Sequence, residues 1–181
     1  DLAAVTQGFD LVLCSLLKAT PLHDNTGFFE TEDLGDFRLH GLLAKRLDAF
    51  EQWIEQAIRE GRRPHLAIDF HNDESGRLHL SRPATGAEAY LARMKTLEDL
   101  LRRHTWFSEG STDPKFRNPG SLGEGLLERY GIDACIHEFN ATRIASLDEP
   151  ASRRRWEEYG AALPRVLAEY FERHPPAKET R

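Results

Sequence analysis

One stretch decides the fold: Pro64-His65-Leu66-Ala67-Ile68-Asp69-Phe70-His71-Asn72-Asp73. A short apolar run that opens with a proline and closes with Asn-Asp is typical of a buried strand that leads into a loop. Because side chains alternate along a strand, we expect Asp69 and His71 on one face and the apolar residues on the other. An imidazole at the end of such a strand can bind a metal, but it is more often structural and needs a partner.

A second strand pattern supplies that partner, in Ile132-Asp133-Ala134-Cys135-Ile136-His137-Glu138-Phe139-Asn140. It is entered through Gly131, and its alternation places Glu138 on a face that is otherwise apolar. A carboxylate in such a place either forms a structural pair or has its proton affinity raised by desolvation, as a general base requires.

Together, the two strands resemble those of zinc carboxypeptidases of the carboxypeptidase A-like family. There, a histidine that closes a strand of the form Ile-Asp-Phe-His is the third zinc ligand, and the match is His71. A late strand carries the glutamate that activates the zinc-bound water, and the match is Glu138. With the turn at 118–125 and a closing amphipathic helix, the resemblance covers residues 40–174. It implies a mixed, mostly parallel sheet flanked by helices, which is all or part of the three-layer carboxypeptidase sandwich.

The resemblance also suggests residues that contact substrate. Asn72 would sit beside the metal with its main chain near the substrate. Phe116 stands where the family has a mobile tyrosine, and it can cover a pocket but cannot donate a hydrogen bond. Lys115 and Arg117 either attract a terminal carboxylate or are charges on a solvated loop.

Part of the family's zinc site has no counterpart. The first two zinc ligands belong to a His-x-x-Glu motif far upstream, and no such motif precedes His71. His40-Gly41 lacks the glutamate and lies too close to His71. There is no Asn-Arg pair for the terminal carboxylate. A catalytic zinc needs three protein ligands, and the resemblance transfers one.

Three functions therefore stay open. The first is the C-terminal half of a zinc carboxypeptidase, whose other ligands come from a missing N-terminal segment or a partner chain. The second is a non-catalytic binding module on the same scaffold. The third is a related zinc amidohydrolase acting on a small acylated amino acid, with a metal shell rebuilt from Asp69, His71, His79 or His137.

Length and composition limit the number of domains and the kinds of partner. The chain has 181 residues and fits one domain, in which residues 1–36 match the family poorly and 175–181 form a frayed tail. A net charge of −6 argues against a nucleic-acid partner, and no apolar run is long enough for a membrane span. Two cysteines, Cys14 and Cys135, define no disulfide framework, so the compartment stays open.

Periodicity predicts the remaining elements. A helix that spans residues 43–58, stops before Gly61 and packs on the sheet should precede the first strand. The segment at 9–17 is a strand or part of a helix, of which we favour the strand. Further elements are a loop at 20–36, a short strand at 78–80, a helix through 90–101, a helix capped by Ser121 and Glu124 that reaches Tyr130, and a last helix through 156–171. Pro164 should kink that last helix or divide it in two.

Overall fold

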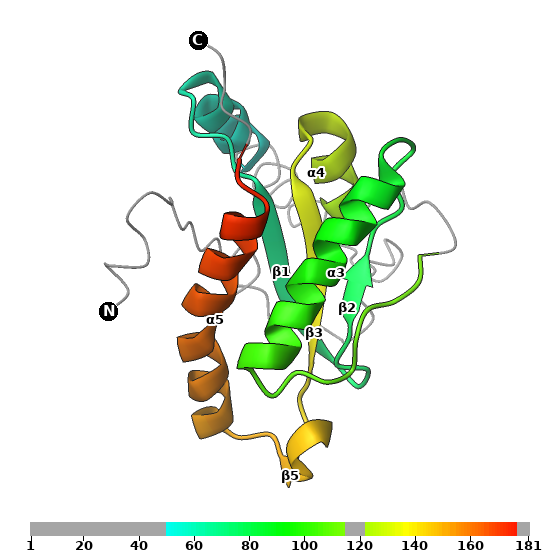
Figure 1. Cartoon of the computed structure of the whole chain (residues 1–181), viewed down its shortest axis with the longest axis vertical. Helices are drawn as coiled ribbons and strands as arrows, with labels where there is room; N and C mark the ends of the chain where they lie inside the picture. Colours follow the sequence, from blue (N-terminus) through cyan, green and yellow to red (C-terminus); the bar gives the residue numbers. More distant parts are fainter. Residues whose placement is uncertain (1–49, 115–121, 177–181) are drawn as a thin grey trace, which may run out of the picture. The chain divides into compact units, whose positions relative to one another are not determined.

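The computed structural model describes residues 50–114 and 122–176 (Figure 1). Within these ranges the fold is mixed α/β, with four α-helices and a three-stranded mixed sheet. The elements, in chain order, are a helix over residues 50–59, β1 (Leu66–Asp73), β2 (Leu78–Leu80), α3 (Ala87–His104), α4 (Leu122–Tyr130), β3 (Asp133–Asn140), β4 (Arg143–Ile144), a 3-10 turn (Ala145–Leu147), β5 (Glu149–Pro150) and α5 (Arg153–Arg173). The predicted strand at 9–17 and the loop at 20–36 lie outside the described residues.

The helix over residues 50–59 belongs to a compact unit that spans Asp10–Pro64, separate from the unit that contains the sheet. It ends as predicted at Gly61, which has a φ of 71°. The Arg62 amide donates to the Ala57 carbonyl at 2.8 Å, and the Gly61 amide donates to the Ile58 carbonyl at 3.1 Å. These two bonds are the usual closure of a helix by a left-handed glycine. That this helix packs on the sheet stays a prediction. That the chain forms a single domain also stays a prediction.

The sheet has the strand order β1-β3-β2. β1 runs parallel to β3, and β2 runs antiparallel to β3 on its other side. Both strands that carry the family resemblance are therefore confirmed as strands, and so is the short strand at 78–80. The register pairs Leu66 with Asp133 at one end and Asp73 with Asn140 at the other.

α3 and α5 run side by side and cover one face of this sheet (Figure 1). The strands contribute alternate residues to the core beneath them, as a period of two requires. The buried cluster comprises Leu78, Tyr90, Met94, Leu97, Leu100, Leu101, Phe107, Cys135, Tyr159, Val166 and Tyr170. The last helix thus contributes Tyr159, Val166 and Tyr170 to the core.

α5 is one helix, so the predicted division in two is wrong, and the predicted kink at Pro164 stays a prediction. It begins after Ser152, whose hydroxyl accepts a hydrogen bond from the Arg155 amide at 3.4 Å. Pro164 lies inside the helix without ending it. Before α5, β4 and β5 form a short antiparallel hairpin that the sequence pattern did not predict.

Candidate functional site

The sheet brings His71 and Glu138 together. The two residues are directly paired in the parallel register of β1 and β3, near the carboxyl ends of both strands. Paired residues of neighbouring parallel strands project to the same face, at a strand spacing of about 4.8 Å. The imidazole and the carboxylate therefore stand next to each other on the face opposite α3 and α5.

Asp69 lies on the same face as His71, two residues earlier on β1. Its Oδ2 is 3.1 Å from Nε2 of His71, and the two side chains are 33% and 24% exposed. A carboxylate bound to one ring nitrogen fixes the orientation of the imidazole. Where the imidazole binds a metal, such a partner also raises its basicity as a ligand.

His137 lies on the other face, which corrects one of the predicted metal shells. Its register partner on β2 is Leu78, a core residue, and its own side chain is only 1% exposed. Because successive residues of a strand alternate, His137 points away from Glu138 and from His71. A shell that includes both His71 and His137 is therefore wrong.

His79 pairs with Ile136, so it shares the face of Glu138 from the edge strand β2. Nε2 of His79 is 3.4 Å from the Ser75 hydroxyl. Among the described residues, no three His, Cys, Asp or Glu side chains gather so as to hold a metal ion. These residues by themselves therefore do not fit a complete zinc site, although they supply one ligand of the kind that zinc requires.

The other predicted site residues are placed only in part. Asn72 is exposed, and its side chain lies on the face opposite that of His71, where it pairs with Phe139. Its predicted contribution through the main chain stays a prediction. Phe116 and Arg117 lie outside the described residues, as does the predicted capping residue Ser121.

One motif at the site escaped the sequence analysis. His71 and Glu74 have the His-x-x-Glu spacing, so the motif is present in the chain, although not upstream of His71. Glu74 is exposed in the turn after β1, and its carbonyl accepts a hydrogen bond from the Asn140 amide group at 2.8 Å. The side chains of the pair belong to no three-ligand group in the described part of the chain.

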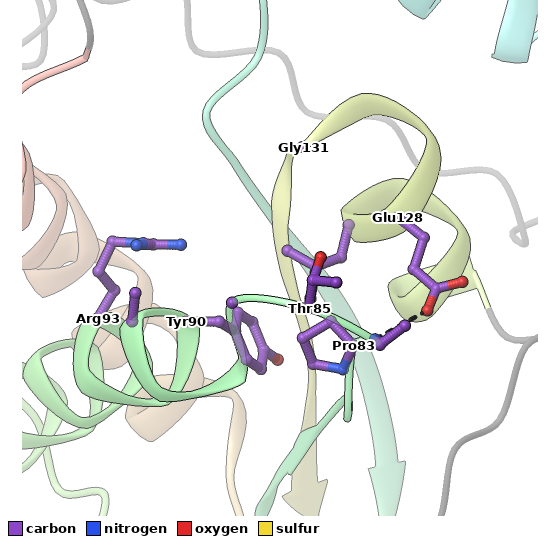
Figure 2. A pocket seen from close by; sticks show the side chains of 10 residues that line it. Pro83, Thr85, Tyr90, Arg93, Glu128 and Gly131 are labelled. Atoms are coloured by element: carbon purple, nitrogen blue, oxygen red, sulfur yellow. Dashed lines mark hydrogen bonds between the residues drawn. The ribbon is translucent and has the colours of Figure 1, made fainter.

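A pocket of about 360 Å³ lies at the opposite end of β3, lined by residues of the β2–α3 loop, α3 and α4 (Figure 2). Its polar side chains are engaged within the fold. Glu128 accepts a hydrogen bond from the Ala84 amide at 3.0 Å, and Arg93 binds both carboxylate oxygens of Asp133 at 2.5 and 2.7 Å. The Arg93–Asp133 pair joins α3 to β3, and no local sequence pattern signals it.

No protein-family model and no curated protein matches the chain. In the part of the chain that the structure describes, every helix is too short or too polar to cross a membrane.

Proposed function

We propose that this chain is the C-terminal part of the catalytic domain of a zinc carboxypeptidase, which hydrolyses a C-terminal peptide bond. The observation that supports this is the register of β1 and β3, which pairs His71 with Glu138 on one face. The two family-like strands need not have been neighbours, since β2 comes between them in the sequence. Their pairing brings the imidazole that we propose as a metal ligand next to the carboxylate that we propose as the general base.

Each residue has a defined role in this proposal. His71 holds the metal, with Asp69 fixing its ring through Nε2, so that the metal would bind at Nδ1. Zinc, when bound, polarises the scissile carbonyl and acidifies water. The Glu138 carboxylate accepts a proton from the attacking water and later returns it to the leaving amine nitrogen.

The remaining two zinc ligands must come from outside the described residues or from a second polypeptide. The same holds for the cation that binds the terminal carboxylate of the substrate, for which Arg117 is the candidate within this chain. The proposal therefore includes a partner segment that carries a His-x-x-Glu motif.

The test compares this chain alone with the chain supplied with such a segment. Zinc content and release of C-terminal amino acids from a peptide library are measured in both. We expect stoichiometric zinc and peptide cleavage only in the supplemented protein. Zinc in the chain alone would favour the amidohydrolase, and no zinc in either preparation would favour the binding module.

Two variants assign the roles. Glu138→Gln should keep zinc and lower kcat by about 10³-fold, because the geometry survives while the base does not. His71→Ala should lose zinc. Asp99→Asn, an exposed residue of α3, is the control for both measurements. Undiminished turnover in Glu138→Gln would remove that residue from the mechanism.

A further inference from the structure

The side chain of His137 connects α5 to the main chain of Glu138. Nδ1 of His137 lies 3.0 Å from the Glu138 carbonyl oxygen, and Nε2 is hydrogen-bonded to the Tyr159 hydroxyl. Tyr159 belongs to α5 and is 2% exposed, and His137 is 1% exposed. A buried helix residue is therefore coupled through one imidazole to the residue that carries the proposed base.

The chemistry of the partners fixes the direction of both hydrogen bonds. A carbonyl oxygen only accepts, so Nδ1 of His137 must donate to Glu138. In a neutral ring the other nitrogen then accepts, so the Tyr159 hydroxyl donates to Nε2. The Glu138 carbonyl thus selects the tautomer, and the Tyr159 hydroxyl donates to the ring nitrogen that this tautomer leaves as an acceptor.

The surroundings keep the ring neutral. Aromatic rings from β1, β3, α5 and the segment after α3 enclose it, with centroids 4.4 Å (Phe139), 5.2 Å (Phe107), 5.5 Å (Tyr159) and 5.8 Å (Phe70) from that of His137. Burial lowers the pKa of His137 to about 4, against the smaller opposing effect of its bond to Glu138.

Two titratable groups near this ring are neutral too. They are the Tyr159 hydroxyl on α5 and the Cys135 thiol, which shares a face of β3 with His137. Burial raises the pKa of Tyr159, and burial raises that of Cys135 to about 12. The tautomer is therefore constant over the range in which a peptidase works.

The hydrogen bond from His137 completes the support of the Glu138 backbone. The Glu138 amide donates to the Arg77 carbonyl at 2.9 Å, which continues the ladder between β3 and β2 by one residue. The Arg77 amide donates instead to the Ser75 hydroxyl at 3.3 Å, so it does not continue the ladder toward the Glu138 carbonyl. The His137 imidazole donates to that carbonyl at 3.0 Å.

The geometry points to His137 and Tyr159 as a positioning pair that holds the backbone of Glu138, and so aims its carboxylate at the substrate beside His71. This inference rests on the proposed function, because it takes Glu138 as the general base. Neither residue touches substrate. Their effect comes from the orientation of the base, to which rates are sensitive because misplacement by 1 Å can cost about 10²-fold.

The first experiment needs no activity. Nitrogen-15 NMR of the unmodified full chain at pH 7 reports which ring nitrogen of His137 carries the proton. We expect a neutral ring protonated at Nδ1, and a shifted Nε2 resonance in Tyr159→Phe, which removes the donor to that nitrogen. A ring protonated at Nε2, or an Nε2 resonance that does not respond to Tyr159→Phe, would overturn the positioning pair.

The second experiment separates positioning from general stability. In the supplemented peptidase, His137→Phe should lower kcat by about 10²-fold with KM changed less than about two-fold. His137→Asn, whose amide can replace the Nδ1 donor, should recover about ten-fold of that loss. Tyr90→Phe is the matched control, since it removes another buried hydroxyl, one that donates to Ala134 at 2.7 Å far from Glu138.

The outcomes distinguish the two proposals. If the supplemented protein has no peptidase activity, the proposed function fails while the tautomer measurement still decides the positioning of Glu138. If activity depends on Glu138 but falls equally in Tyr90→Phe and His137→Phe, the proposed function stands and the positioning pair fails. Absence of any recovery in His137→Asn would also contradict the pair.

Discussion

Each face of the β1–β3 strand pair carries a histidine, and the surroundings of the two histidines differ. His71 stands on the face opposite α3 and α5, a quarter exposed and oriented by Asp69. His137 stands on the face covered by α3 and α5, where it is enclosed by aromatic rings and bonded to Tyr159. Alternation along the strands thus separates a residue suited to chemistry from one that supports it.

The difference shows that a covered face tolerates polar groups only when the covering helices supply partners. α5 provides Tyr159 for His137, while α3 and α5 provide Arg93 and Tyr170 for Asp133. Removing such a partner leaves a buried polar group unpaired, which costs more than losing an exposed pair.

The largest effect is expected at Tyr159. Tyr159→Ala removes a buried ring from the helix-covered face and should lower the free energy of unfolding by about 4 kcal/mol. Tyr159→Phe keeps the ring and should cost about 1 kcal/mol, for the lost hydrogen bond to His137. Urea unfolding of both variants measures these changes in the free energy of unfolding. Equal effects of the two substitutions would show that packing of the ring is unimportant.

The second prediction concerns acid stability through His137. Its pKa is lowered from an ordinary 6.5 to about 4 by burial, so the unfolded chain binds the proton more readily than the folded chain. The stabilisation is complete above pH 6.5 and is lost progressively as the pH falls to about 4. The loss over this window should be about 3 kcal/mol.

The difference between the unmodified chain and His137→Phe isolates this contribution from other titrating groups. Urea unfolding at several pH values between 7 and 4 should show a steeper loss of stability in the unmodified chain. Parallel curves for the two proteins would mean that His137 is protonated equally in the folded and unfolded states.

The third prediction tests the polar group at the other end of β3. Asp133→Asn keeps the volume but removes the charge that binds Arg93, and we expect a loss of about 2 kcal/mol. Asp99→Asn is the matched control, because Asp99 pairs with Lys95 at 2.7 Å on the exposed side of α3. That substitution should change stability by less than about 0.5 kcal/mol. A similar loss of stability in both variants would mean that the partly buried Arg93–Asp133 pair stabilises the fold no more than the exposed Lys95–Asp99 pair.

Much of the fold followed from local patterns. β1 and β3 combine alternating apolar residues with a bounding proline or glycine, and α3 has apolar residues at helical spacing, so these elements were predictable. β4 and β5 have two residues each, too few for any period to be detected. The order β1-β3-β2 was not predictable either, because strand pairing is set by contacts between segments distant in sequence.

The candidate site, like the fold, could be predicted only in part. The alternation rule, applied from Glu138, already places His137 on the opposite face, so that error was avoidable. The pairing of His71 with Glu138 became visible only with the register. The Arg93–Asp133 and His137–Tyr159 contacts join residues of different elements, for which a single sequence carries no periodic signal.

The smallest effect is expected at His71. His71→Ala removes a side chain that is 24% exposed and whose bond to Asp69 joins two partly solvated groups. The free energy of unfolding should therefore change by less than about 1 kcal/mol. The same substitution should abolish zinc binding in the supplemented peptidase. A residue that binds metal and does not stabilise the fold should show a small change in stability together with complete loss of zinc. A loss as large as that of Tyr159→Ala would instead make His71 a structural residue, and the contrast between the two faces would no longer hold.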